Sequence, residues 1–230
     1  MAVMKSNISG QSESLKDSTS REKVLKKVRH ALLEPSDSPY PDLDIESSVY
    51  TKIEEEKDVQ FAYELSELGA NFIYCKSPED MLKKVSALFI ENKWSEACCN
   101  DELLIGLLRH AGVEVYNNNA NAAFHKIAVT GCECLIARTG SVLVSSAQES
   151  GRRLPFTADI HIVIAFTSQV VLDIKHALDF IRRKYNYKLP SMISIISGNG
   201  RSDEIEKIML PLGHGPKELY VFMADEDNLE

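Results

Sequence analysis

The sequence has no segment that could span a membrane or direct export. Within its 230 residues, no apolar run approaches the ~20 residues that a bilayer-spanning helix needs. The first seven residues, Met-Ala-Val-Met-Lys-Ser-Asn, have no apolar stretch of the signal-peptide type. We therefore expect a cytoplasmic protein without a membrane span.

A strongly basic patch is also missing. The chain has 26 Lys and Arg residues against 34 Asp and Glu residues, which gives a formal net charge of −8. The densest basic run, residues 23–29, has the spacing of the solvated side of a helix. An acidic surface repels phosphate backbones, so nucleic acid is not an expected partner.

The cysteines lack the spacing of a disulfide framework or a metal site. Five cysteines are present, an odd number, and none of them forms the Cys-x-x-Cys pair that zinc and iron–sulfur sites commonly use. Cys132 and Cys134 could supply two ligands, but they lie in an apolar run where cysteine usually acts as a small hydrophobe. We expect neither a disulfide framework nor a metal centre in this chain.

The N-terminal region differs in character from the rest. Residues 1–19 are polar and are predicted to form a disordered tail. Thr19 and Glu22 then match a capping box, followed by apolar residues at helical spacing. We predict a helical arm and linker over residues 20–57. The apolar stripe of this helix must be covered by the main body or by another copy of the chain, which makes a homo-oligomer one expectation.

Residues 58–230 are predicted to form one α/β domain. One helix ends at Gly69, a second starts after Ser77 and a third is capped by Asn100-Asp101-Glu102, and they alternate with short strands at 72–75, 97–99 and 113–116. The leucines at 103, 104, 107 and 108 are expected to face inward. Such alternation is typical of a mostly parallel, Rossmann-like sheet flanked by helices.

The second half carries more strands. Residues 127–130, 134–137 and 141–145 are separated by glycine-containing turns, which suggests hairpins. Residues 161–166 are nearly all apolar, as in a strand covered on both faces, and His161 at its start is expected to be structural. A helix is predicted from Ser168, with further buried strands at 192–197 and 219–223.

Glycines concentrate in this second half, where seven of the eleven follow residue 130. The sharpest candidate site is the turn Gly198-Asn199-Gly200-Arg201-Ser202 after a predicted strand. Its backbone N–H groups and the guanidinium of Arg201 suit an anionic ligand. The alternative is a plain structural turn, since Asp203 and Glu204 already complement the following helix end.

Two other glycine turns are candidates. Hydroxyl groups flank Gly140 in Thr139-Gly140-Ser141, and Arg152 follows nearby, so these residues could hold an anionic group or form a turn and an exposed basic loop. His214, next to Gly215, could act as a general acid or base, or could simply bond neighbouring backbone. It is the only catalytic candidate.

Several motifs, in order, resemble one family. They are Thr130-Gly131-Cys-Glu-Cys-Leu-Ile-Ala-Arg-Thr139-Gly140-Ser141, Gly151-Arg-Arg-Leu-Pro155, His161-Ile-Val-Ile, Leu189-Pro-Ser-Met-Ile-Ser and Gly213-His-Gly-Pro-Lys-Glu-Leu219. Over residues 60–225 the chain resembles the lactate-utilisation (LUD) domain family, in its LutC/YkgG branch. The resemblance implies a fold similar to the ribose-5-phosphate isomerase, CoA-transferase and formyltetrahydrofolate cyclo-ligase group.

Two departures from the family pattern stand out. Members commonly have Gly-Pro-Ser-Arg-Thr where this chain has Gly-Asn199-Gly200-Arg201-Ser202, and many have an acid where this chain has Arg138. The shared Gly and Arg support a functional glycine turn. An acid that took part in chemistry would be lost here.

The resemblance implies a cytosolic accessory or ligand-binding component of a system that oxidises L-lactate to pyruvate. Its partners would be iron–sulfur proteins that carry the clusters, with no cofactor in this chain. A stand-alone enzyme acting on a phosphorylated or CoA-linked metabolite is the alternative, so whether the chain is itself an enzyme stays open. We expect both glycine turns and His214 to meet in one anion-binding cleft at the carboxyl edge of the sheet.

Overall fold

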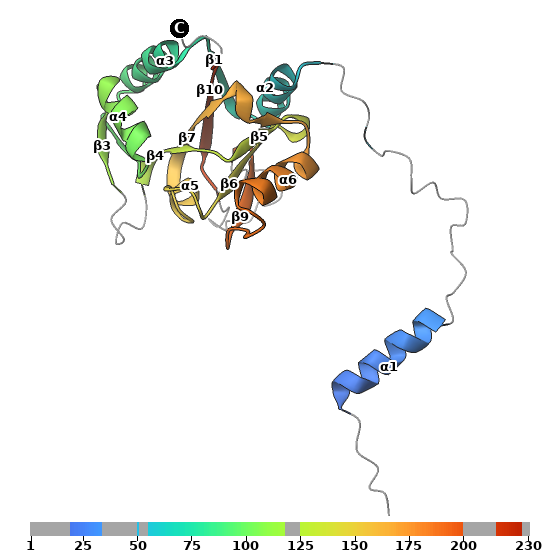
Figure 1. Cartoon of the computed structure of the whole chain (residues 1–230). Helices are drawn as coiled ribbons and strands as arrows, with labels where there is room; N and C mark the ends of the chain where they lie inside the picture. The colour runs from blue at the N-terminus through green and yellow to red at the C-terminus, as the bar shows by residue number, and fades with distance from the viewer. Residues whose placement is uncertain (1–18, 34–49, 51–54, 118–124, 200–214, 227–230) are drawn as a thin grey trace, which may run out of the picture. The chain divides into compact units, whose positions relative to one another are not determined.

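The computed structural model describes residues 19–33, 50, 55–117, 125–199 and 215–226 (Figure 1). The chain divides into two compact units, residues 1–51 and 52–230. Residues 1–18 of the predicted tail and most of the predicted linker lie outside the described part.

In the first unit, helix α1 (Ser20–Leu33) forms as predicted. Its capping box is present, because the Glu22 backbone N–H donates to Thr19 Oγ1 at 3.3 Å and the Thr19 N–H donates to the Glu22 carboxylate at 2.8 Å. Val24, Leu25 and Val28 are among its exposed apolar side chains. No helix in the described ranges has both the length and the apolar character needed to cross a membrane.

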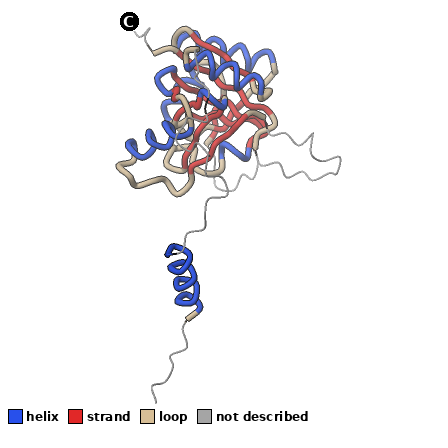
Figure 2. The backbone as a smooth tube through the Cα atoms, turned by 90° about the vertical axis from the view of Figure 1, so that its right-hand side faces the viewer, coloured by secondary structure: helices blue, strands red, loops and turns tan. Residues whose placement is uncertain are grey.

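In the part of the second unit that the structure describes, six parallel strands form the main sheet, and strands lie at the centre of the unit in Figure 2. In spatial order these are β1 (Asn71–Cys75), β10 (Glu218–Ala224), β7 (Ala158–Phe166), β4 (His125–Gly131), β2 (Glu96–Cys98) and β3 (Glu114–Tyr116). All of these pairings are parallel, which confirms the predicted fold class.

Two helices cover one face of this sheet, α3 (Pro78–Glu91) and α4 (Glu102–His110) (Figure 1). Both start at the predicted caps: Ser77 Oγ accepts from the Asp80 N–H at 3.3 Å, and the Asp101 carboxylate accepts from the N–H groups of the second and third residues of α4. Their apolar stripes pack on Ile162 and neighbouring residues of β7. The prediction for Leu103 was wrong, since this side chain is 81% exposed.

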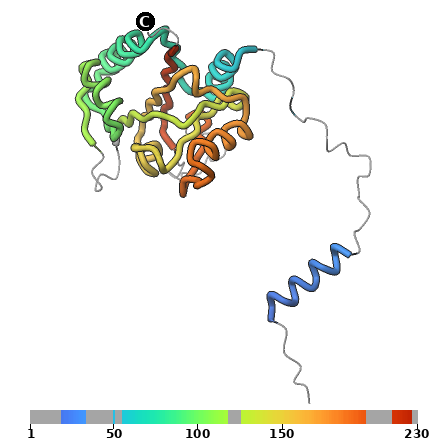
Figure 3. Tube along the Cα trace, in the orientation of Figure 1, coloured from blue at the N-terminus to red at the C-terminus, as the bar shows by residue number. Residues whose placement is uncertain are grey.

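A second, smaller sheet covers the other face. Its strands are ordered β8 (Val170–Val171), β5 (Cys134–Ile136), β6 (Ser141–Ser145) and β9 (Ile193–Ser197). Helix α2 (Lys57–Glu67) packs beside it, with Phe61 and Leu65 in a core shared with β7 and β10. Helix α6 (Ile174–Lys184) covers its outer face through Ala177 and Ile181. In Figure 3, α2, drawn in cyan, lies beside the later segments of this sheet although it precedes them in the chain.

Two sequence predictions were wrong in this half. Only β5 and β6 form a hairpin, because the apolar β4 is buried on both faces and pairs in parallel with β7. The predicted helix starts at Ile174 and not at Ser168. A 3₁₀ turn, η2 (Thr167–Gln169), comes first, β8 follows it, and Asp173 then caps α6 by accepting from the His176 N–H at 3.2 Å.

His161, in the middle of the sheet, is fully buried. Thr130 Oγ1 donates to the Gly131 carbonyl at 2.9 Å, so His161 Nε2 donates to Thr130 Oγ1 at 2.8 Å. Its Nδ1 atom is buried and has no hydrogen-bond partner among the described residues. Burial lowers the pKa of His161 to about 4, so its ring is neutral near pH 7.

Candidate functional site

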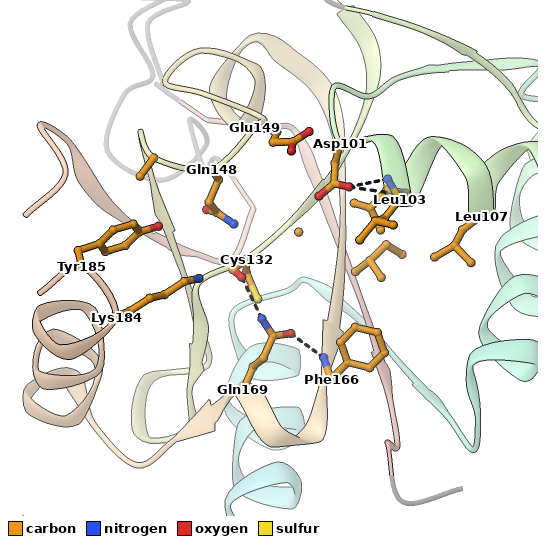
Figure 4. A pocket seen from close by; sticks show the side chains of 14 residues that line it. Asp101, Leu103, Leu107, Cys132, Gln148, Glu149, Phe166, Gln169, Lys184 and Tyr185 are labelled. Atoms are coloured by element: carbon orange, nitrogen blue, oxygen red, sulfur yellow. Dashed lines mark hydrogen bonds between the residues drawn. The ribbon is translucent and has the colours of Figure 1, made fainter. Parts of the chain in front are cut away.

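A cavity of about 700 Å³ lies where β4 and β7 end. It is bounded by the start of α4, the turn after β4, the loop after β6, and the end of α6 (Figure 4). In open parallel sheets, ligands bind in the crevice outside the carboxyl ends of the strands. The volume lies within the range of about 300–1,000 Å³ typical of small-molecule sites.

One side of the cavity rests on a buried carboxylate. Glu133 is fully buried and accepts three hydrogen bonds: from Ser145 Oγ at 2.5 Å, Lys184 Nζ at 2.7 Å and the Tyr185 hydroxyl at 2.7 Å. Lys184 and Tyr185, at the end of α6, both line the cavity. Glu133 therefore holds these two side chains in place.

This arrangement sets the protonation of the polar groups. Burial opposes the charge on Lys184, but the hydrogen bond and charge of Glu133 outweigh it and raise the pKa of the ammonium, which stays protonated. Burial, together with the hydrogen bond to Glu133, also raises the pKa of the Tyr185 hydroxyl. The cavity therefore presents one cation and one neutral hydroxyl on this side.

Two glutamines lie nearer the sheet. Gln169 is held at both ends of its amide, since its Oε1 accepts from the Phe166 N–H and its Nε2 donates to the Cys132 carbonyl, both at 2.9 Å. Gln148 Oε1 accepts from the Ser145 N–H at 3.0 Å, which fixes its amide orientation. Gln148 Nε2 lies near Gly131. A Cβ atom added to Gly131 would have this nitrogen, at 4.0 Å, as its one neighbour within 4 Å among the described residues.

The opposite side is largely apolar. Leu103, Leu104 and Leu107 of α4 line it together with Ile164 and Phe166 of β7. Asp101 and Glu149 add two carboxylates to the lining, on the other side of the cavity from Lys184 in Figure 4. The cavity therefore has a polar side at α6 and an apolar side at α4.

The predicted glycine turns lie elsewhere. Ser141 Oγ donates to the Thr139 carbonyl at 2.9 Å and shares a hydrogen bond of 2.8 Å with Ser197 Oγ, so the turns at Gly140 and Gly198 are neighbours, as expected. Both glycines face α2 and its end. A Cβ atom on Gly140 would lie 2.3 Å from the Leu65 nitrogen, and one on Gly198 would lie 2.7 Å from Leu68.

The expected location at the carboxyl edge was wrong for these turns. Asn199 Oδ1 accepts from the N–H of Leu219, near the start of β10, at 2.8 Å, and its Nδ2 donates to the Gly69 carbonyl, just before β1, at 2.7 Å. The turns therefore lie at the amino edge of the main sheet. The prediction assumed that the strands before these turns belong to the parallel main sheet. Strands β6 and β9 belong to the small sheet instead, so their carboxyl ends need not lie at the carboxyl edge of the main sheet.

The remaining predicted residues are spread out. Arg152 donates to Ser191 Oγ, beside the far end of β6 from Ser141, and is therefore not brought to the glycine turns. Gly215 joins Gly198 in lining a separate cavity of about 170 Å³. Gly200, Arg201, Ser202 and His214 lie outside the described residues, so anion binding there and catalysis by His214 stay predictions.

Sequence reasoning missed the residues of the larger cavity. One signal was available, because Glu133 interrupts the apolar run around Cys132 and Cys134, and a buried acid needs partners. Two of those partners, Lys184 and Tyr185 at the end of α6, are about fifty positions away, with no motif linking them to Glu133. Across the ranges that the structure describes, no group of three or more His, Cys, Asp and Glu residues could hold a metal ion.

Comparisons with known proteins identify the family of this chain. The model of the LUD domain matches residues 59–223. Lactate utilization protein C of Bacillus subtilis (strain 168) is 29% identical over 102 residues, 43% of this chain and 42% of that protein. YkgG of Escherichia coli (strain K12) is 29% identical over 111 residues, 47% of this chain and 48% of that protein. The chain thus spans less than half the length of these curated relatives.

A solved structure agrees with the fold. A DUF162 family protein from Deinococcus radiodurans, solved at 1.70 Å, superposes with a TM-score of 0.55 at 16% identity. The superposition covers 73% of this chain and 96% of that protein. At this identity the likeness concerns the fold alone. The family model, which spans well over half of the sequence, is what decides membership: the chain belongs to the LUD domain family.

Proposed function

We propose that the chain is a component of a lactate-utilisation system and serves there by binding a small molecule. Family membership and the resemblance to proteins named Lactate utilization protein C support the system. Because the aligned region is less than half of each relative, the role of the whole protein is part of the proposal.

The observation that carries the binding role is the position of the larger cavity. It opens at the carboxyl ends of β4 and β7, the edge at which parallel α/β sheets bind ligands. Gly131, the last residue of β4, leaves the floor of the cavity open, and Lys184 supplies a charged donor at its side.

The chemistry of the lining favours binding over covalent catalysis. Cys132 is the sulfur nucleophile in the lining, and burial raises the pKa of its thiol, so the reactive thiolate is suppressed near pH 7. The carboxylate of Glu133 is occupied by three donors. We therefore keep a stand-alone enzyme acting on a phosphorylated or CoA-linked metabolite as the second candidate, which the experiment below distinguishes from a binding subunit.

Partner proteins complete the proposal. A ligand-binding subunit needs redox partners to oxidise lactate, and we propose cytosolic iron–sulfur proteins in that role, with the clusters on the partners and none on this chain. The ligand that we propose is a small anion, because the cation of Lys184 lines the cavity.

Deletion of the gene in its source organism tests the function. We expect growth on L-lactate as sole carbon source to fail while growth on pyruvate continues, because pyruvate lies beyond the oxidation step. A tagged chain should co-purify with proteins that show iron–sulfur absorption. Normal growth on lactate would contradict the proposal, and turnover of a phosphorylated or CoA-linked metabolite by the pure chain would favour the alternative.

A further inference from the structure

We propose that the larger cavity binds an amphipathic carboxylic acid bigger than lactate. Its carboxylate would lie against Lys184 and Gln148, and its apolar chain against α4 and the end of β7. This inference rests on the proposed function, in which this cavity is the ligand site.

Size is the first argument. Liquid water takes about 30 Å³ per molecule, so about 700 Å³ has room for roughly twenty waters. Lactate, with six non-hydrogen atoms, replaces only a few of them and would leave most of the apolar wall wet. A ligand gains affinity by removing apolar surface from water, at roughly 25 cal/mol per Å². The long wall formed by Leu104, Leu107 and Phe166 therefore favours an occupant with an apolar chain.

The anchor for the carboxylate is Lys184. Its ammonium carries three donors, and the hydrogen bonds found for it among the described residues use one of them, on Glu133 at 2.7 Å. The nitrogen also lies 5.7 Å from the centre of the Tyr185 ring and 5.8 Å from that of Phe180, contacts that help to hold the charge in place. In Figure 4 the Lys184 side chain extends into the cavity.

Gln148 provides a second donor on the same side. Its Oε1 is fixed by the Ser145 N–H, so the Nε2 group turns toward Gly131 and the cavity floor. A carboxylate has two oxygens and can accept from both Lys184 and Gln148. This pair distinguishes an acid from an alcohol of the same length.

The two acids in the lining fix the orientation of the ligand. Asp101 already accepts two backbone N–H groups at the start of α4, and Glu149 is exposed on its loop. Both would repel a carboxylate placed near α4. The acid end must therefore lie at α6 and the apolar end at α4.

Octanoate is a suitable probe, with 1-octanol and lactate as comparisons. By calorimetry on the full chain, we expect octanoate to bind about ten- to a hundredfold more tightly than 1-octanol, the worth of a charged hydrogen bond. Lactate should bind more weakly than octanoate. Octanoate binding no tighter than 1-octanol or lactate would overturn the proposal.

A double variant tests the anchor. Lys184→Met with Glu133→Gln removes the cation without leaving a buried charge unpaired. Octanoate affinity should fall about ten- to a hundredfold, with 1-octanol affinity unchanged. Lys175→Met, an exposed lysine at the start of the same helix, is the matched control and should bind octanoate like the natural chain. Equal octanoate affinity in the double variant would overturn the proposal.

A third variant avoids any risk to folding. Gly131→Ala adds a methyl group to the cavity floor, where Gln148 Nε2 at 4.0 Å is the nearest neighbour. It should weaken octanoate and 1-octanol alike at an unchanged melting temperature. Unchanged affinity for both would place the probes elsewhere and overturn the inference.

Complementation separates this inference from the proposed function. A deletion strain that grows normally on lactate would refute the function, while the octanoate measurements would stand. If the deletion strain fails to grow on lactate but the double variant restores growth fully, the proposed function stands. The carboxylic-acid site is then not needed for lactate utilisation.

Discussion

The two edges of the main sheet use glycine in opposite ways. At the amino edge, Gly140 and Gly198 sit where the backbone of α2 and its end come closer than any side chain would allow. At the carboxyl edge, Gly131 faces the open floor of a cavity. Glycine at a strand end therefore indicates a close approach, and its neighbour is protein backbone in one case and the space for a ligand in the other. Among the described residues, the two glycines of the amino edge pack against α2 and leave a cavity of about 170 Å³ beside Gly198, whereas the carboxyl edge carries the cavity of about 700 Å³.

The largest expected effect tests the amino edge. Gly140→Ala should lower the free energy of unfolding by about 3–5 kcal/mol, because the new Cβ would lie 2.3 Å from the Leu65 nitrogen and the residue has φ +55°. Urea titration measures this loss. Gly151→Ala is the matched control, with φ +65° and nothing within 4 Å, and should cost only about 1–2 kcal/mol. Equal losses in the two variants would show that α2 is not tightly docked.

A second effect arises between the two edges, at His161 in β7. Its pKa falls from an ordinary 6.5 to about 4 on folding, so between these values the unfolded chain binds more protons than the folded one. Stability is full above pH 6.5, decreases as the pH falls toward 4 and levels off below that, a loss of roughly 3 kcal/mol.

The measurement is the difference between the natural chain and His161→Gln across this range, which removes the contribution of other titrating groups. The variant should have the flatter stability profile between pH 6.5 and 4. Parallel profiles would mean that folding leaves the pKa of the His161 ring unchanged.

A smaller effect concerns Asn199, which joins the amino edge through two hydrogen bonds. Asn199→Ala leaves the Leu219 N–H and the Gly69 carbonyl without these partners, so it should cost about 2 kcal/mol in chemical unfolding. Asn199→Asp keeps the acceptor for Leu219 and should recover part of the loss. No recovery would assign the effect to the Gly69 bond alone.

The smallest effect has the opposite sign. Gly106 lies in α4 on the wall of the carboxyl edge, and a Cβ atom there would meet nothing within 4 Å. Gly106→Ala should raise the free energy of unfolding by up to about 1 kcal/mol through helix propensity. Thermal melting checks it. A loss of stability would contradict the prediction and would mean that the added methyl group does not fit at Gly106.

The alternating first half of the domain could be predicted from sequence. Local signals acted there: Ser77 with a following proline, Asp101, and Gly69 each ended or began a helix within a few residues. Strand β7 was equally clear, because a long apolar run covered on both faces leaves few alternatives.

The second sheet and the cavity could not be predicted. Strands β5, β6 and β9 are short, and nothing local to β9 reveals that it pairs with β6, about fifty positions earlier. Likewise, Lys184 reads as one more basic residue at the end of α6, until the fold places it 2.7 Å from Glu133. Such partnerships depend on tertiary packing, which periodicity does not report.

The order of strands has a consequence for synthesis of the chain. Strand β1, the first among the described residues, pairs along its whole length with β10, the last among them, from Asn71 against Tyr220 to Cys75 against Ala224. A ribosome making about 5–20 residues per second needs roughly 7–30 s between these two strands. Until β10 emerges, β1 lacks its neighbour and β7 has one open edge, a template for wrong pairing. A nascent chain stalled before residue 218 should therefore depend on chaperones, whereas the complete domain closes its own sheet.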